Sequence, residues 1–326
     1  MENVVDPSHV PVSHHGIAGN RYTGPKPIPL EPPAHWPLPT KEGFVYSSVN
    51  EEFSSVDTTT FYPPCLVVTQ TEDASGTLKL ILYGTPTRPG FCRLIGRQAY
   101  VHKHVPKSKE AKKQAKEDKK AGVPKSQFKS AASIAAALPA WLQHVTGHLF
   151  LHQDMVFLHH QEKILASAGY DSSTYGQAVF VPTAADRAVM ALRKWITKFG
   201  SGGPAWDKGC DPTLPPREHN REALFNVYES HTKNCANCQG ALKNVKKASR
   251  AAKTAAVVSF AWALLRGARA VGTATASPSA SVLNAVTMRA MLPGVALTLA
   301  SLGTVKALKK LHGMFFTYSF HHQDSN

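Results

Sequence analysis

Residues 58–102 read TTTFYPPCLVVTQTEDASGTLKLILYGTPTRPGFCRLIGRQAYVH, and this stretch decides the fold class. β-branched and aromatic residues dominate three runs in it, and the turn signals ASG and RPG separate them. The preceding GFVYSSVN, at 43–50, has the same character. Such runs joined by short turns are typical of antiparallel strands, so the sequence predicts an antiparallel sheet over residues 43–102.

Two helical patterns follow the predicted sheet. Residues 138–167 (LPAWLQHVTGHLFLHQDMVFLHHQEKILAS) predict one long helix, and residues 184–199 (AADRAVMALRKWITKF) predict a second helix after a cap at Thr183. Glycine and proline mark residues 200–216 as a loop, and Pro-rich residues 17–43 as an extended connector. Strands that precede the helices, rather than alternate with them, predict an α+β protein.

Composition narrows the class of protein. The chain has 326 residues, of which 43% are hydrophobic, and this is enough for a large core in one big domain or two smaller ones. Its five cysteines are too few and too unevenly spaced for a secreted disulfide framework, which favours a reducing or redox-active compartment. Met1 is followed by no secretory signal and runs directly into a cluster of histidines, a start that would fit an internal methionine of a longer protein.

The excess of positive charge is local. The formal net charge is +15, and residues 103–130 contribute ten lysines against three acidic residues. No aromatic residues alternate with these lysines for base stacking, and no nucleic-acid-binding motif accompanies them. The segment is therefore interpreted as a solvated insertion, and no nucleic-acid partner is expected.

The C-terminal part of the chain has a different character. Residues 254–265, 270–288 and 290–305 are largely uncharged and rich in Ala, Gly, Ser and Thr, which suit helix packing in lipid. None of these runs alone reaches the roughly 18 to 20 strongly apolar residues of a membrane span. Basic residues lie on both sides of these runs, with Lys243, Lys246, Lys247, Arg250 and Lys253 before and Lys306, Lys309 and Lys310 after, as the positive-inside rule requires of a hairpin of two spans over 254–310. A transmembrane hairpin is predicted, and a pair of Ala-rich soluble helices is the alternative.

Histidines and acids are concentrated at the start of the chain, in ENVVDPSHVPVSHHG at 2–16. His9 and His14 would supply two imidazoles, and one carboxylate from elsewhere would complete the two-His, one-carboxylate set of non-haem Fe(II) oxygenases. Asp6 strengthens this interpretation because a ligating histidine usually donates its other N–H to a carboxylate or a carbonyl.

The predicted long helix offers the distant carboxylate. On a helical wheel Asp154 falls mid-way across the apolar face, where an unpaired carboxylate is costly unless a metal or a cation neutralises it. An Asp154 paired with Arg93 or Arg97 is the alternative. His148 and His152 form a competing metal pair, but the wheel places them on an opposite, solvated face.

The ordered set of motifs resembles the pheophorbide a oxygenase family of Rieske-type oxygenases. This family includes pheophorbide a oxygenase, chlorophyllide a oxygenase and the Rieske components of the inner chloroplast envelope translocon. The motifs are ENVVDPSHVPVSHHGIAGNR, TPTRPGFCRLI, LHQDMVFLHHQEKIL, VPTAADRAVMALRKWI and ESHTKNCANCQGAL. The resemblance covers nearly the whole chain, and the order of the motifs makes it specific.

The resemblance implies a helix-grip, START-like catalytic domain over residues 1–230, with an antiparallel sheet wrapped around long helices. His9, His14 and Asp154 would hold a mononuclear Fe(II), and Asp6 would relay electrons from a Rieske cluster across a subunit boundary in a homotrimer. Members use dioxygen and ferredoxin-derived electrons on chlorophyll-type tetrapyrroles. A C-terminal hairpin anchors several members in plastid membranes, and we expect the inner envelope or the thylakoid here, with the hairpin as anchor and residues 311–326 as a tail.

One departure from the family pattern concerns the electron input. A Rieske [2Fe–2S] cluster needs two cysteines and two histidines, which the family provides as Cys-x-His and Cys-x2-His. None of the five cysteines here is followed by histidine at either spacing, so the ligands of that cluster are absent from this sequence. We therefore expect the catalytic part of an oxygenase that is incomplete by itself. The alternative function is a non-catalytic, membrane-bound tetrapyrrole carrier or translocon component.

Cys235 and Cys238 form a Cys-x2-Cys pair in the linker 231–253. The pair is open to three interpretations: a redox switch, half of a zinc site completed by His231 with Cys210 or His219, or inert thiols. The family resemblance favours a regulatory disulfide addressed by thioredoxin. The remaining histidines and the tryptophans Trp141, Trp195 and Trp206 are expected to serve packing.

Overall fold

The computed structural model describes residues 1–6, 9, 13–14, 38–50, 55–73, 76–102, 138–181, 186–273 and 280–319. The predicted cap at Thr183, the Lys-rich segment 103–130 and most of the Pro-rich connector lie outside the described residues. The chain forms two compact units, which we call the sheet unit and the hairpin unit. The sheet unit comprises residues 1–139, 149–219 and 320–326, and the hairpin unit comprises residues 140–148 and 220–319.

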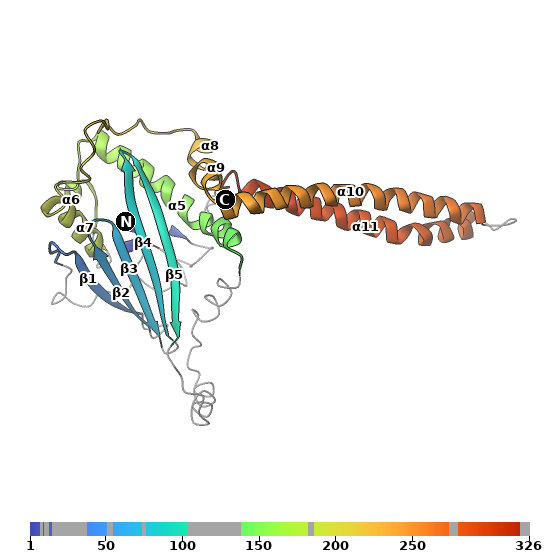
Figure 1. Ribbon diagram of the computed structural model, residues 1–326, viewed down its shortest axis with the longest axis horizontal. Coiled ribbons are helices and arrows are strands. Elements are labelled where there is room, and N and C mark those ends of the chain that lie inside the picture. Colours follow the sequence, from blue (N-terminus) through green and yellow to red (C-terminus); the bar gives the residue numbers. More distant parts are fainter. Residues whose placement is uncertain are drawn as a thin grey trace, which may run out of the picture. The chain divides into compact units, whose positions relative to one another are not determined.

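A five-stranded sheet forms the centre of the sheet unit. Its strands are β1 (Phe44–Asn50), β2 (Ser55–Tyr62), β3 (Leu66–Asp73), β4 (Gly76–Arg88) and β5 (Phe91–His102). They follow one another in the order of the sequence, and every neighbouring pair is antiparallel (Figure 1). Gly90, in the RPG turn between β4 and β5, has a φ of 74°, which favours glycine. The predicted antiparallel sheet is confirmed.

One face of the sheet carries the core of this unit. Because successive side chains of a strand point to opposite faces, Phe44 and Tyr46 of β1 lie on the same side as Phe61 of β2. The ring of Phe61 is 5.1 Å from the ring of Trp195, at an interplanar angle of 73°. Trp195 belongs to α7 (Asp186–Lys198), the second predicted helix. Ala188, Val189, Ala191 and Leu192 of the same helix are also buried in this core.

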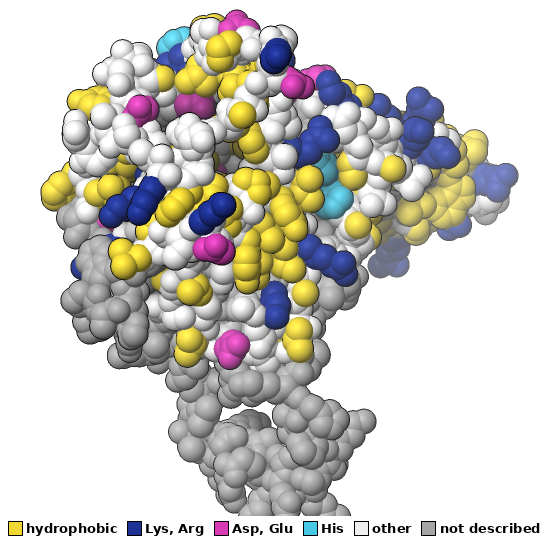
Figure 2. Space-filling model, turned by 60° about the vertical axis from the view of Figure 1, so that its left-hand side comes forward, with side chains coloured by type: hydrophobic (Ala, Val, Ile, Leu, Met, Phe, Trp, Pro, Cys, Tyr) yellow, Lys and Arg dark blue, Asp and Glu magenta, His cyan; other side chains and the backbone are white. Residues whose placement is uncertain are grey.

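The opposite face of the sheet is exposed in part. Val45, Tyr62, Tyr83 and Ile95 occupy neighbouring positions on it and are all exposed. Figure 2 shows hydrophobic side chains at the surface in several patches, among Lys and Arg side chains.

The predicted long helix is confirmed as α5 (Ala140–Ser167), but its environment differs from the predicted one. His148 and His152 are only 7% and 4% exposed, whereas Phe157 and Ile164 are 51% and 54% exposed. The prediction that the histidine face is solvated is therefore wrong. The wheel assumed one buried face along the whole helix, but α5 contributes its first nine residues to the hairpin unit and the rest to the sheet unit.

The hairpin unit contains two long antiparallel helices, α10 (Ala236–Thr273) and α11 (Ala280–Met314) (Figure 1). Three short elements precede them: α8 (Arg221–Leu224), α9 (Val227–Ser230) and the 3-10 turn η2 (Thr232–Asn234). The residues after α11 return to this region, since Val227 N–H donates to the Phe316 carbonyl at 2.9 Å.

Small residues line the contact between α10 and α11. Ala256, Ser259, Ala263 and Gly267 are the buried residues of α10 along this stretch, at spacings of three and four. Gly294 of α11 approaches so closely that a Cβ there would lie 2.6 Å from the Ala263 Cβ, and the Ser259 and Thr298 hydroxyls are 2.9 Å apart. Such contacts let helix backbones approach each other closely.

The outer surfaces of both helices are apolar. Val257, Val258, Phe260, Leu264 and Leu265 of α10 are exposed, as are Leu292, Leu297, Leu299 and Leu302 of α11. By length and composition, α10 and the Asn284–Met314 part of α11 are each long and apolar enough to cross a membrane. The α+β class is confirmed, and the helix-grip, START-like assignment stays a prediction.

Replacing Phe61 by alanine should destabilise the sheet unit by about 3–5 kcal/mol, because the side chain is fully buried against Trp195. Phe180→Ala is the matched control, since Phe180 is 91% exposed, and its effect should stay within about 0.5 kcal/mol. Urea unfolding followed by circular dichroism measures both. Equal destabilisation by the two substitutions would contradict the proposed position of the core.

Candidate metal centre

The N-terminal segment, which carries the predicted iron motif, is anchored to the sheet. α1 (Glu2–Val5) places Val5 in the core, where its side chain is fully buried. The Tyr46 hydroxyl donates a hydrogen bond to the Val5 carbonyl. Burial raises the pKa of Tyr46, so the hydroxyl keeps its proton for this bond at neutral pH. These contacts fix the backbone immediately before Asp6 and His9.

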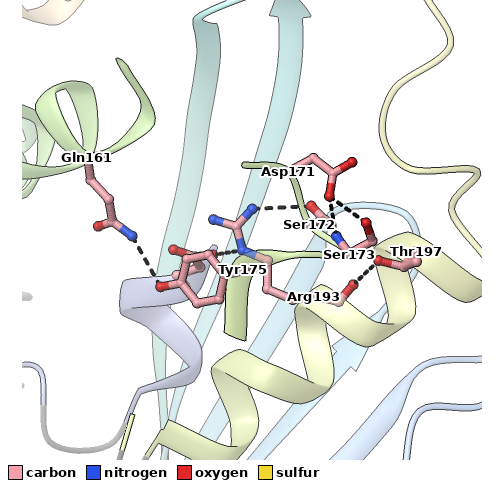
Figure 3. Close-up of polar contacts among 8 residues, drawn as sticks. Gln161, Asp171, Ser172, Ser173, Tyr175, Arg193 and Thr197 are labelled. Atoms are coloured by element: carbon pink, nitrogen blue, oxygen red, sulfur yellow. Dashed lines mark hydrogen bonds and ion pairs between the residues drawn. The ribbon is translucent and has the colours of Figure 1, made fainter. Parts of the chain in front are cut away.

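A second anchor is the Arg193 guanidinium on α7 (Figure 3). Its Nε forms an ion pair with Glu2, and its Nη1 donates to Ser172 Oγ at 3.2 Å. The guanidinium lies over the ring of Tyr175, in α6 (Tyr175–Ala178), at 4.3 Å from the ring centre. The Tyr175 hydroxyl accepts from Gln161 Nε2 at 3.2 Å. This network connects α1 to α5, α6 and α7 within the sheet unit.

The structure brings His9, His14 and Asp154 together. His9 Nε2 lies 3.0 Å from Asp154 Oδ1, and His14 Nε2 lies 3.4 Å from the same oxygen. The two imidazole rings meet edge to face, with their centres 4.9 Å apart. The side chains of His9, His14 and Asp154 are only 10%, 5% and 18% exposed. The three predicted ligands therefore form one cluster, and Asp154 faces imidazoles rather than Arg93 or Arg97.

Electrostatics favour an ionised carboxylate in this cluster. Burial alone would raise the pKa of Asp154, but the facing nitrogens of His14 and His9 outweigh burial and hold that pKa well below its usual value. Burial would lower the pKa of His14, and the neighbouring Asp154 carboxylate and Gln153 amide raise it instead. The Asp154 carboxylate is thus negative at neutral pH.

The donor set fits a divalent cation. Among the residues that the structure describes, neither His9 Nε2 nor Asp154 Oδ1 has a partner in hydrogen-bond geometry, although both atoms are buried. A buried carboxylate oxygen without such a partner is costly, and a metal ion would satisfy it together with both imidazoles. Two histidines and one carboxylate leave further coordination positions open, as in non-haem iron sites.

Gln153 is a member of this site that the sequence analysis missed. Its Oε1 lies 2.9 Å from His14 Nδ1, in a buried contact that joins residues 139 positions apart. An amide oxygen only accepts hydrogen bonds, so His14 Nδ1 carries a proton, and Nε2 is the ring atom that would bind a metal ion beside Asp154. The position of Gln153 directly before Asp154 was the only signal in the sequence, and adjacency to Asp154 does not reveal a contact with His14.

Asp6 lies at the C-terminal end of α1, and its backbone carbonyl accepts the His9 N–H at 3.3 Å. This bond places Asp6 and His9 on one local turn. The predicted role of the Asp6 side chain in electron relay stays a prediction.

A second cluster of metal-binding side chains lies in the hairpin unit. His144 of α5, His231, Cys235 and Cys238 each offer one ligand atom, and these atoms all lie within 4.8 Å of one another. Both cysteines are free thiols. Burial and the neighbouring His144 ring lower the pKa of His231, so its imidazole is neutral near pH 7. The histidine beside His231 in this cluster is His144, where the sequence analysis considered Cys210 or His219.

Other predicted packing residues have structural contacts. His159 Nε2 accepts the Glu218 N–H at 3.0 Å, and His160 Nδ1 accepts from Arg217 Nε at 3.0 Å. Trp141 packs against Phe315, with ring centres 6.1 Å apart, and Trp195 packs in the sheet core. Trp206 is half-buried.

The two histidines and the carboxylate, largely shielded from solvent, match the ligand set of mononuclear non-haem metal centres. Residues 61–172 match the model of a family described as pheophorbide a oxygenase. The chain is related to this family, and the resemblance seen in its sequence motifs is confirmed.

Individual relatives are chloroplast proteins by name. The chain is 29% identical over 259 residues to "Pheophorbide a oxygenase, chloroplastic" of Oryza sativa subsp. japonica. This match covers 74% of this chain and 43% of the relative. The chain is 27% identical over 268 residues to "Flavonoid 8-hydroxylase 2, chloroplastic" of Ocimum basilicum. This match covers 75% of this chain and 43% of the relative.

A shorter match, of 33% identity over 110 residues, is to "Protochlorophyllide-dependent translocon component 52, chloroplastic" of Arabidopsis thaliana, and it covers 34% of this chain and 19% of the relative. The chain thus spans about two fifths, or 43%, of the length of the first curated relatives that it matches. No solved structure matches the chain significantly.

Gln153→Leu should weaken Fe(II) binding about 10–100-fold, because His14 loses the acceptor that fixes its ring and its tautomer. Gln153→Glu keeps an acceptor oxygen and should retain the affinity. Anaerobic titration of the metal-free protein with Fe(II) measures the dissociation constant. Gln177→Leu, at an exposed position of α6, is the matched control. If Gln153→Leu bound Fe(II) as tightly as this control, Gln153 would have no positioning role.

Proposed function

We propose that the chain is the catalytic part of a chloroplast oxygenase that binds one Fe(II) through His9, His14 and Asp154. The observation that carries the proposal is the convergence of these three residues, predicted as ligands, from segments about 140 positions apart. The named oxygenase relatives support the reaction class.

The side chains of the cluster have distinct tasks in this proposal. Asp154 supplies negative charge that offsets part of the charge of the cation, and Gln153 holds the His14 ring with Nε2 toward the ion. The anchored N-terminal segment keeps His9 in place through Val5 and Glu2. When bound, Fe(II) would supply the one-electron chemistry that activation of dioxygen requires.

The electron supply belongs to this proposal as well. Incorporation of one oxygen atom of O2 into a substrate, with the other released as water, consumes two electrons and two protons. By the family resemblance, ferredoxin would donate these electrons and a Rieske cluster would carry them. Asp6, beside His9, would relay them in the last step to the iron. This transfer across a subunit boundary would require the homotrimer.

A chlorophyll-derived tetrapyrrole is the proposed substrate, in a reaction like that of pheophorbide a oxygenase or chlorophyllide a oxygenase. The family match and two of the relatives support a tetrapyrrole by name. The flavonoid hydroxylase among the relatives makes a flavonoid the competing substrate class. The match to a translocon component keeps a non-catalytic membrane protein as the second candidate function.

We also propose that α10 and α11 anchor the chain in a chloroplast membrane, either the inner envelope or the thylakoid. Support comes from the small residues between the helices, the hydroxyl contact of Ser259 with Thr298, and the apolar side chains that cover their outer surfaces. Lys and Arg side chains near the ends of the hairpin, such as Lys246 and Lys309, would remain outside the hydrocarbon.

The oxygenase proposal is tested with the iron-loaded chain, a soluble chemical reductant and 18O2, with pheophorbide a or a flavone as substrate. We expect 18O in the tetrapyrrole product by mass spectrometry. His9→Ala should lower the yield more than about 100-fold, since loss of an outer partner of a ligand already costs 10–100-fold. His159→Ala is the control, because His159 contacts the Glu218 backbone instead.

The binding of the tetrapyrrole is measured in the same samples by fluorescence quenching. Equal binding by the wild type and His9→Ala, with no 18O product from either, would favour the carrier function. Product from the flavone alone would refute the tetrapyrrole proposal and leave the oxygenase class intact.

The membrane proposal is tested by flotation of the full chain with vesicles of chloroplast lipids. Val258→Asp combined with Leu299→Asp should abolish flotation, since a charge at the centre of a span costs about 2.5–3.5 kcal/mol. Both side chains are more than 60% exposed, so soluble helices would tolerate the changes. Val45→Asp, on the exposed sheet face, is the control. Unchanged flotation of the double variant would show that the hairpin is not inserted.

A further inference from the structure

We propose that His144, His231, Cys235 and Cys238 bind one Zn2+ ion in a closed structural site of the hairpin unit. The proposal concerns a different cluster from that of His9, His14 and Asp154, and it does not depend on the oxygenase function.

Four of the six distances among the ligand atoms are close to those of a tetrahedron around zinc, and all six are within 4.8 Å. With Zn–N bonds of 2.0–2.1 Å and Zn–S bonds of 2.3 Å, tetrahedral angles place two nitrogens about 3.3 Å apart and a nitrogen and a sulfur about 3.6 Å apart. The observed distance from His231 Nε2 to His144 Nδ1 is 3.3 Å. The distances from His144 Nδ1 to Cys235 Sγ and to Cys238 Sγ are both 3.4 Å, and that from Cys238 Sγ to His231 Nε2 is also 3.4 Å.

Hydrogen bonding alone does not explain this arrangement. His144 Nδ1 lies within 3.4 Å of three polar atoms, namely His231 Nε2, Cys235 Sγ and Cys238 Sγ. A ring nitrogen has either one hydrogen or one lone pair, so it makes one good hydrogen bond and not three. Ligand atoms that all face a common point are instead the arrangement that a metal ion requires.

The local fold presents the four ligands from three segments. His144 lies on the first part of α5, His231 lies between α9 and η2, and the two cysteines flank the start of α10. Their spacing, His231-x3-Cys235-x2-Cys238, is compatible with a short zinc-binding turn. The Thr232 hydroxyl, which is buried, donates to the Phe315 carbonyl at 2.8 Å and holds this turn against the end of α11.

Apolar side chains close the site. Cys238 is 1% exposed and packs in a cluster with Val145, Leu242 and Phe315. The ring of His148 lies edge to face against His231, with ring centres 4.7 Å apart. With four protein ligands and this enclosure, no coordination position remains for a substrate, which is typical of structural zinc sites.

The ligand chemistry selects the metal. Two sulfurs and two imidazoles in a tetrahedron are typical of zinc, whereas iron at His9, His14 and Asp154 would have nitrogen and oxygen ligands. Both cysteines are free thiols in the structure, so Cys235 and Cys238 are assigned here as zinc ligands rather than as a disulfide. Zinc would hold α5, the η2 turn and α10 together within the hairpin unit.

The first experiment measures the metal content of the purified full chain by inductively coupled plasma mass spectrometry. We expect about one zinc per chain in the wild type, and less than a tenth of that in His144→Gln and in Cys238→Ser. His159→Gln and Cys210→Ser are the matched controls and should keep their zinc. His9→Ala should also keep its zinc, which separates this site from the proposed iron site.

A second measurement uses the wild type and therefore does not depend on the folding of a variant. N-ethylmaleimide labelling, mapped by peptide mass spectrometry, should leave Cys235 and Cys238 unmodified until a zinc chelator is added. Replacement of zinc by Co2+ should give the intense visible absorption of a tetrahedral cobalt thiolate site.

Three results would overturn the proposal. Thiols that react only after a reductant, in zinc-free protein, would establish the disulfide that thioredoxin could address. Thiols that react without a chelator would establish free cysteines that bind no metal and form no disulfide. Zinc that is retained in Cys238→Ser and lost in His9→Ala would place the metal at the other cluster.

Discussion

The negative charge of Asp154, buried on α5, is the constraint on which the arrangement of the sheet unit depends. A carboxylate held away from water needs a cation or several hydrogen-bond donors, and here the side chains that face it come from the first 14 residues of the chain. His9 and His14 reach it only because the segment before them is fastened to the sheet through Val5, Tyr46 and the Arg193 ion pair. The core contacts of α1 thus determine the geometry of the site.

The two clusters of metal-binding residues differ in what they leave accessible. The first has three ligands, one of them a carboxylate, and such a set has room for exogenous ligands. The second has four ligands, two of them sulfur, inside an apolar enclosure. α5 contributes Asp154 to the first cluster and His144 to the second, so one helix would supply a ligand to both proposed sites.

Local patterns predicted the elements well. Runs of β-branched and aromatic residues between turn signals gave the antiparallel sheet, because strand pairing across short turns is a local property. The long helices were also recognised. The cluster of His9, His14 and Asp154 was anticipated from ligand chemistry and from the family resemblance, and its role as an iron site remains a prediction.

Contacts between distant residues could not be predicted in the same way. The wheel placed His148 and His152 in solvent because it treated α5 as having one environment, whereas both are buried. Gln153 and His144 were missed because their partners lie 139 and 87 positions away. Nothing in the local sequence distinguishes a histidine such as His144 from its neighbours on α5.

The separation between His14 and Gln153 also has a consequence for biosynthesis. A ribosome adds about 5–20 residues per second. Gln153 follows His14 by 139 positions, so it is made roughly 7–28 s after His14. The five strands of the sheet are made during that interval, whereas Gln153 and Asp154 are made only at its end. A metal ion could therefore meet all three side chains only once Asp154 has been made, and until then His14 lacks its partner on the long helix.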